Sequence, residues 1–199
     1  MTDRVGEVIE ASTTRIKAQR EELEGPPAFG SFVKVPSGPS VTSYAVVYNV
    51  YETSVDPSRR PLALGLTEEE LKSQQPQIFE MLRLEFEAAI VGFKDQAGCV
   101  NAYLPPWPPR IHSFVESCTP DEIVSLTEDL EFIRSINSLP GLPTDELIAA
   151  AVRIAYQNRD CDRSFLVRAG REIAIMLKDE YERARSILRR LGHVKSEGK

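Results

Sequence analysis

Apolar and polar residues alternate along several stretches in the first half of the chain. This period of two runs through residues 5–11 (VGEVIEA) and 29–35 (FGSFVKV), and it returns over residues 84–93. Such alternation is typical of strands that bury one face. The run at 41–51 (VTSYAVVYNVY) is rich in β-branched and aromatic residues and nearly continuous in apolar character. We therefore expect a strand there with much of both faces covered.

Turn signals separate the predicted strands and indicate how they connect. The segment 36–39 (PSGP) closes the strand at 29–35, and the segment 95–98 (DQAG) precedes a further strand at 99–104. The strands on either side of that second turn are expected to form a hairpin. Five or six strands over roughly 100 residues are typical of a small closed antiparallel β-barrel, because closure removes the exposed edges of an open sheet.

A segment with a different sequence pattern, from about residue 55 to 82, separates the third and fourth predicted strands. Thr67 and Glu70 have the spacing of a capping box, which predicts a short helix directly after them. Pro76 can begin a second helical turn. Upstream, residues 57–61 (PSRRP) predict a stiff basic loop. We expect a short helical insertion here, which barrel packing does not explain.

The hydrophobic period changes in the second half of the chain. A proline-rich stretch at 104–109 (LPPWPP) lacks the backbone donors that a sheet needs, so it leaves the barrel as extended chain. Beyond it, apolar residues recur at helical spacing after a capping box at Thr119. Three helices are predicted, over residues 120–137, from Thr144 to a break at 160–162, and over residues 163–191.

The expected fold is therefore α+β, with a small closed antiparallel β-barrel that carries a short helical insertion and is followed by a three-helix module. The expected domains are a barrel over 1–105, a proline-rich linker over 106–116 and an α-helical domain over 117–199. Trp107, the single tryptophan, lies in the linker. In one interpretation it packs in the seam between the domains, and in the other it is an exposed proline-aromatic ligand for a partner.

Composition narrows the class of protein. The chain has 199 residues, of which 42% are hydrophobic and 27% charged, the balance of an ordinary globular protein. Its apolar runs are short of the roughly 18 residues that a membrane span needs, and residues 1–10 lack the apolar core of a secretory signal. Three well-separated cysteines favour free thiols. We expect a soluble cytoplasmic protein without a membrane partner.

The charge balance bears on the choice of partner. The chain's 24 Lys and Arg against 30 Asp and Glu give a net charge of −6. This acidity disfavours nucleic acid, whose phosphates carry the same sign. Residues 163–190 are the exception, because eight basic residues face four acids there. That stretch is either a solvated helix face stabilised by pairs four residues apart or an anionic docking site.

Searches for catalytic and cofactor motifs find none. The chain lacks the glycine–lysine phosphate loop of nucleotide triphosphatases and the glycine pattern of dinucleotide-binding folds. Its two histidines, His112 and His193, are too few for a zinc site. Cys118 at a helix entry is not expected to be a reactive thiol, and the pair Glu85 and Glu87 is better explained as the solvent face of an alternating strand than as paired carboxylates. We therefore expect no enzyme activity, no cofactor and no bound metal.

A family resemblance adds to this interpretation. The segments 5–8 (VGEV) with 12–14 (STT), 29–35 and 44–50 (YAVVYNV) resemble the HAS-barrel, named for its use in HerA-type translocases and rotary ATP synthase subunits. Residues 60–61 (RP), 75–77 (QPQ) and 104–106 (LPP) are similar to stand-alone members, which are associated with cyanobacteria. In the ATPase families the barrel precedes a motor domain and helps to assemble subunits into a ring. This chain lacks the motor's phosphate loop, so the resemblance implies a barrel without ATPase catalysis.

Two functions stay open from the sequence. The first is a non-catalytic assembly or adaptor protein that uses its barrel for protein–protein interaction or oligomerisation. The alternative is a regulatory module that binds a nucleotide or another anionic ligand through Arg59, Arg60 and the basic stretch at 163–171. The residues expected to form a contact surface, for a protein partner or a second copy, are Arg59, Arg60, Gln75, Gln77 and Trp107.

Overall fold

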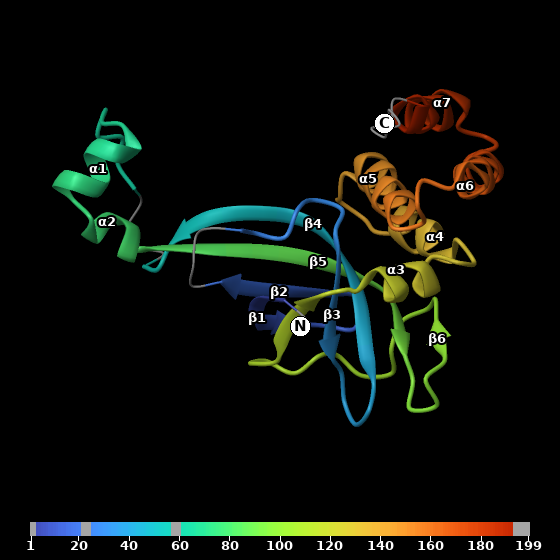
Figure 1. Ribbon diagram of the computed structural model, residues 1–199, viewed down its shortest axis with the longest axis horizontal. Coiled ribbons are helices and arrows are strands. Elements are labelled where there is room, and N and C mark those ends of the chain that lie inside the picture. The colour runs from blue at the N-terminus through green and yellow to red at the C-terminus, as the bar shows by residue number, and fades with distance from the viewer. Residues whose placement is uncertain (1–2, 21–24, 57–60, 193–199) are drawn as a thin grey trace.

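The computed structural model describes residues 3–20, 25–56 and 61–192, which form strands and helices in the order shown in Figure 1. The strands are β1 (Arg4–Ala11), β2 (Arg15–Arg20), β3 (Phe32–Pro36), β4 (Thr42–Ser54), β5 (Leu82–Lys94), β6 (Val100–Asn101) and β7 (Phe114–Ser117). The helices are α1 (Glu68–Gln74), α2 (Gln77–Glu80), α3 (Pro120–Leu126), α4 (Glu131–Asn137), α5 (Thr144–Gln157), α6 (Arg163–Met176) and α7 (Tyr181–Gly192).

Six of the strands close into an antiparallel barrel. Their order is β2-β1-β7-β3-β4-β5, and β5 pairs back with β2 to complete the ring. The short β6 lies outside the ring and pairs with the end of β5, which confirms the hairpin predicted around residues 95–98. The predicted α+β class and the closed barrel are therefore confirmed. Closure gives the barrel strands a neighbour on both sides, so the ring exposes few unpaired backbone groups.

Alternate residues of the barrel strands fill its interior. The inward-facing side chains are apolar and mostly short, as the limited width of a six-stranded barrel requires. It consists of Val5, Val8, Ile16, Ala18, Val33, Val35, Ala45, Val47, Leu84, Phe86, Ala88, Ile90 and Val115. The largest of these is Phe86, and its ring lies against Gly6, where a Cβ would approach the ring to 2.8 Å. Gly6 therefore gives Phe86 the room it needs in the interior.

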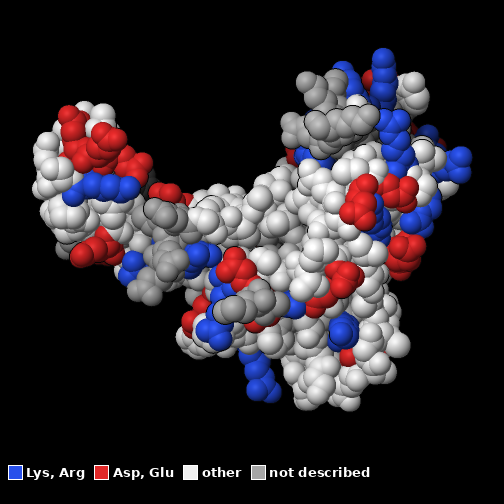
Figure 2. Space-filling model, in the orientation of Figure 1, with Lys and Arg blue, Asp and Glu red and all other residues white. Residues whose placement is uncertain are grey.

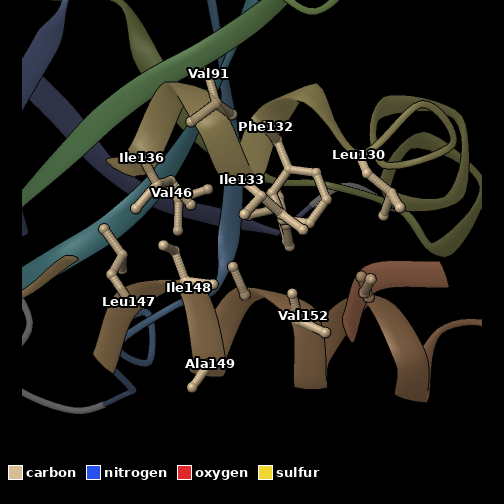
Figure 3. Packing of buried hydrophobic residues seen from close by; sticks show 14 of the residues in the cluster. Val46, Val91, Leu130, Phe132, Ile133, Ile136, Leu147, Ile148, Ala149 and Val152 are labelled. Carbon is tan, nitrogen blue, oxygen red and sulfur yellow. The ribbon is translucent and has the colours of Figure 1, made fainter. Parts of the chain in front are cut away.

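The outer face of β3, β4 and β5 is covered by the helices. Val46 and Val91 on that face meet Ile133 and Ile136 of α4, with α5 packed beneath them (Figure 3). Because Ala45 and Val47 face the barrel interior while Val46 faces the helices, β4 is buried on both sides here. The expectation for residues 41–51 is confirmed at this end of the strand.

The helical part is divided more finely than predicted. In the described part of the chain, five helices follow the barrel instead of three, because the expected helix at 120–137 is split into α3 and α4 and that at 163–191 into α6 and α7. Leu130 separates α3 from α4 in a left-handed conformation (φ 64°) while its side chain is buried. Leu177 ends α6 and is also buried. Each break changes the direction of the chain, so that the apolar face of the next short helix packs on the common core. A single straight helix would extend beyond this core.

The sheet extends past the predicted end of the barrel at residue 105. β7 lies at the end of the predicted linker and pairs with both β1 and β3. Its Val115 is fully buried in the barrel. Just before β7, the amide of His112 donates to the Val8 carbonyl at 2.9 Å. A strand of four residues is too short to show a period of two, so the hydrophobic pattern cannot reveal that this strand completes the barrel.

A charged pair joins the barrel to the helices. Lys34 Nζ of β3 donates to Glu122 Oε1 of α3 at 2.8 Å. Glu122 also closes the predicted capping box, since the amide of Thr119 donates to Glu122 Oε2 at 2.8 Å. Burial by itself raises the pKa of the Glu122 carboxyl, but the hydrogen bonds from Lys34 and Thr119 outweigh it and hold the pKa below the ordinary 4.5.

Gly30 allows close contact between the barrel and α5. Its backbone is left-handed (φ 85°), and its amide donates to the Val47 carbonyl at 2.7 Å. A Cβ at this position would lie 2.4 Å from the Cβ of Ala150 in α5. A glycine before β3 and an alanine on α5 are thus both required for the two parts to meet at this distance.

Replacing Gly30 with alanine should therefore destabilise the fold by about 2–4 kcal/mol, from backbone strain and overpacking together. Urea denaturation measures the change. The matched control is Gly141→Ala, because Gly141 is also left-handed (φ 75°) but has no heavy atom within 4 Å of an added Cβ. The control should lose only the strain, about 1 kcal/mol. Equal losses in the two variants would contradict this description of the contact.

Replacing Glu122 with glutamine should remove a pH-dependent part of the stability. Because the pKa of Glu122 is lower in the folded chain, its contribution is complete above about pH 4.5 and is lost as the pH falls through the folded pKa. The difference in unfolding free energy between wild type and E122Q should be about 1 kcal/mol at neutral pH and should vanish in acid. Glu182→Gln, at an exposed site without an ion pair to any described residue, should leave the pH dependence unchanged.

Candidate interaction site

β4 and β5 continue past the end of β3 as an arm, in which β2 accompanies β5 as far as Leu84 and only the last residues of the arm are two-stranded. β3 pairs with β4 only from Thr42 to Val46, whereas β5 pairs with β4 as far as Ser54. The outer edge of β4 therefore has no partner strand over its last residues among those described. Figure 1 shows the arm leaving the body and carrying α1 and α2 at its far end. We call residues 61–81 at this end the tip.

The tip has no hydrophobic core of its own. Neither α1 nor α2 contains a buried residue. Leu62 is 82% exposed, and Leu64 and Met81 are also exposed. An isolated helix of seven residues is unstable in water without packing or capping. The tip thus presents apolar side chains that nothing in the described chain covers.

Local polar interactions hold α1 in place of a core. The Glu70 amide donates to Thr67 Oγ1 at 3.3 Å, and the Thr67 amide donates to Glu70 Oε2 at 2.8 Å, which confirms the predicted capping box. Lys72 Nζ lies 2.7 Å from Glu68 Oε1 and 5.8 Å from the centre of the Phe79 ring. These contacts order the helix but leave its apolar side chains accessible.

The tip is also acidic. It contains four glutamates and one lysine. Figure 2 shows the acids gathered over the outer surface of the tip, with a single basic side chain among them. Acidic groups around exposed leucines favour a partner surface that is apolar at its centre and basic at its edge.

Two of the five predicted contact residues lie on the tip. Gln75 caps the end of α1, and Gln77 begins α2. Arg59 and Arg60 lie outside the described residues. Of the predicted contact residues, the structure thus brings Gln75 and Gln77 together on the tip.

Trp107 lies elsewhere. Its side chain is 54% exposed and rests on the turn between β3 and β4, where a Cβ on Gly38 would lie 3.4 Å from the ring. The tip joins the opposite end of β4, and a strand of 13 residues is about 40 Å long. The interpretation of Trp107 as a residue of the seam between barrel and helices is wrong, because it belongs to neither buried cluster. It does not form one surface with Gln75 and Gln77.

The basic stretch at 163–190 is partly neutralised by bridges between elements. Arg183 Nε donates to Asp145 Oδ1 at 2.7 Å, and Arg190 pairs with Glu146 at 2.5 Å, both on α5. These bridges join helices instead of neighbouring turns of one helix. The expected ion pairs four residues apart within this stretch do not form among the described residues; Arg183 pairs instead with Asp145 and with Glu180 three residues before it.

The chemistry-bearing residues singled out in the sequence have structural partners. The solvent-face prediction is wrong for Glu85, which is buried and pairs with Lys17 Nζ at 2.7 Å, while Glu87 accepts from Asn49 at 3.2 Å. Cys118 is buried, and this burial raises the pKa of its thiol. Among the described residues, no three His, Cys, Asp or Glu side chains come together in a way that could hold a metal. None of the described helices is long and apolar enough to cross a membrane.

The exposed leucines of the tip are candidate contact residues that sequence reasoning missed. Residues 61–66 (PLALGL) alternate apolar with small residues and carry no charge. That pattern was available in the sequence. An apolar run beside a capped acidic helix that lacks apolar residues at helical spacing indicates an insertion that does not pack on its own.

The three cysteines should differ in reactivity. Cys99 and Cys161 are exposed, so both should react promptly with a chromogenic disulfide reagent in the folded protein. The buried Cys118, with its raised pKa, should react only after denaturant is added. A Cys118→Ser variant should release the same number of thiols in both conditions. Three prompt thiols in the wild type would contradict the packing described for Cys118.

Comparison with known families gives a match to most of the barrel. Residues 5–95 match the family model described as HAS barrel domain. The match spans β1 to β5, and the sixth barrel strand, β7, lies beyond it. The search of curated proteins found no match. The matched residues supply five of the six strands of the closed antiparallel barrel, so residues 5–95 are similar in sequence to a HAS barrel domain and form most of a closed barrel.

Proposed function

We propose that this chain is a non-catalytic assembly protein that binds another protein molecule through the tip of its arm. The observation that carries the proposal is the exposure of Leu62, Leu64 and Met81 on an insertion without a buried residue in either helix. Contiguous apolar side chains on a soluble protein, surrounded by polar ones, are typical of a protein interaction site.

The energetics of the arm support this proposal. Ordering a residue of backbone opposes folding by about 1–2 kcal/mol, and apolar burial normally offsets it at about 25 cal/mol per Å². The tip orders two helices without that burial. Binding a partner would supply the missing burial, which gives the arm a physical role that barrel packing does not.

The surroundings of the chemistry-bearing residues support a role without catalysis. Hydrolytic or transfer chemistry needs a nucleophile beside a base in an accessible pocket. Cys118 is inaccessible, and the charge of Glu85 is balanced by Lys17. His112 is exposed and its Nδ1 lies 2.6 Å from Glu7 Oε1, and among the described residues no nucleophilic side chain hydrogen-bonds to either of them.

Replacing Leu62, Leu64 and Met81 together with serine should abolish association while leaving stability nearly unchanged. Each residue is exposed, so each change should alter the unfolding free energy by no more than about 0.5 kcal/mol. Light scattering over a concentration series measures self-association, and capture from the native cells on immobilised chain measures binding to other proteins. Thermal unfolding checks the fold.

Ile111 and Val167 provide the matched control, because both are large, apolar and similarly exposed but lie away from the tip. The double variant I111S/V167S should associate like the wild type. If the wild type stays monomeric at every concentration and captures nothing that the tip variant does not also capture, the proposal is wrong. A large fall in thermal stability of the tip variant would instead assign the leucines to the fold.

A further inference from the structure

A groove lies between α6 and α7, on the side of the helical part away from the barrel. It has a volume of about 400 Å³. Its apolar lining includes the exposed Ala174 and Tyr181 and the partly buried Leu188, and its basic side chains are Lys178, Arg185 and Arg189. No acidic residue lines it. A cavity of this size with an apolar surface is in the range that proteins use to bind partner side chains.

The basic residues of the groove are free to bind. Lys178, Arg185 and Arg189 make no ion pair with any residue in the described ranges, whereas Arg183 and Arg190 beside them are paired with acids of α5. Arg185 and Arg189 are one helical turn apart on α7, so their charges add along one edge of the groove. The groove thus combines an apolar surface with three uncompensated positive charges.

The tip is complementary to the groove in both apolar surface and charge. Its exposed leucines match the apolar surface of the groove, and its glutamates match the three cations. Glu69 in particular is exposed and has no ion pair with a described residue. Desolvated apolar contact at the centre with charge pairs at the rim is the usual construction of a specific interface, and the charges add to the rate and selectivity of association.

One copy of the chain cannot bring the two surfaces together. Figure 1 places α1 and α2 at one end of the longest axis of the molecule and α6 and α7 at the other. The strands of the arm are hydrogen-bonded to each other along their whole length, so the arm does not fold back. A contact between tip and groove therefore has to join two molecules.

We propose that the tip of one copy docks in the α6–α7 groove of a second copy. This inference rests on the proposed function and names the partner as a second copy of the chain. The two surfaces are different, so the contact is heterologous, and each bound copy still offers a free groove or a free tip. Such contacts continue head to tail and give a ring where the geometry closes or a filament where it does not.

Charge reversal at either surface should weaken self-association at least about tenfold in Kd, since each pair of reversals replaces attraction by repulsion. The tip variant is E69R/E80R, which leaves the Glu68–Lys72 pair intact, and the groove variant is R185E/R189E. All four positions are exposed, so both variants should keep their thermal stability. R163E/R171E is the matched control, because it reverses two exposed cations of α6 outside the groove and should associate like the wild type.

Mixing the two variants is the decisive measurement. The intact tip of the groove variant fits the intact groove of the tip variant, and the reversed tip of the one is complementary in charge to the reversed groove of the other, so an equimolar mixture should recover assemblies larger than a dimer in sedimentation velocity. Combining all four reversals in one chain should restore assemblies larger than a dimer. A mixture that stays as weakly associated as each variant alone, or reversals that leave association unchanged, would overturn the proposal.

The outcomes separate this inference from the function on which it rests. If the wild type does not self-associate but its tip captures another protein from the native cells, the docking of a second copy is wrong and the assembly function stands. If the wild type neither self-associates nor captures a protein through its tip, both are wrong. A small apolar ligand that fills the groove without affecting self-association would also overturn the docking proposal.

Discussion

The central strands of the sheet are buried on two faces at one end and become partly exposed toward the other, and the rest of the structure depends on this contrast. At the body end, Ala45 and Val47 fill the barrel while Val46 packs under the helices. Beyond that point Asn49 and Glu52 are exposed. The same two strands therefore anchor the core and carry a projecting arm, and the strong pairing between them transmits the rigidity of the first part to the second.

The body of the molecule and the tip differ in how many side chains they bury, and their different roles follow from this. The barrel interior and the face under α4 and α5 hold the large buried side chains, so stability is concentrated there. The helices α1 and α2 add nothing to either cluster. Residues of the tip can thus change without loss of the fold, which leaves them free to serve binding. By contrast, Gly30 and Lys34 lie where the barrel meets the helices and have little freedom to change.

The parts of the structure that the sequence reveals are those with local physical signals. Alternation marks the long strands, and the hydroxyl–carboxylate spacing at Thr67 and Thr119 marks two helix starts. The break after Leu177 has no such signal, because Ile173, Leu177 and Ala184 keep helical spacing across it. Only the tertiary core decides that the chain bends there. The location of Trp107 is likewise a tertiary matter, since the flanking prolines restrict the chain without fixing the surface it meets.

The surface of the tip illustrates a second limit. Helix caps at Thr67 and Pro76 predict the insertion, yet nothing local states that its leucines stay uncovered. Exposure is a property of what the remaining chain can reach, and here the arm holds residues 61–81 away from the core. The sequence therefore indicates the elements of the candidate site, while the length and direction of β4 and β5 decide that they form a surface.

The late position of β7 in the chain has a consequence for biogenesis. β1 and β3 are made early, but the strand that lies between them is supplied only at residues 114–117. Until the ribosome has released that segment, the cylinder has an open slot with two unsatisfied backbone edges, which are prone to intermolecular pairing. A fragment cut at the prolines would keep this slot permanently. The native barrel thus acquires its protection against aggregation in the last step of its closure.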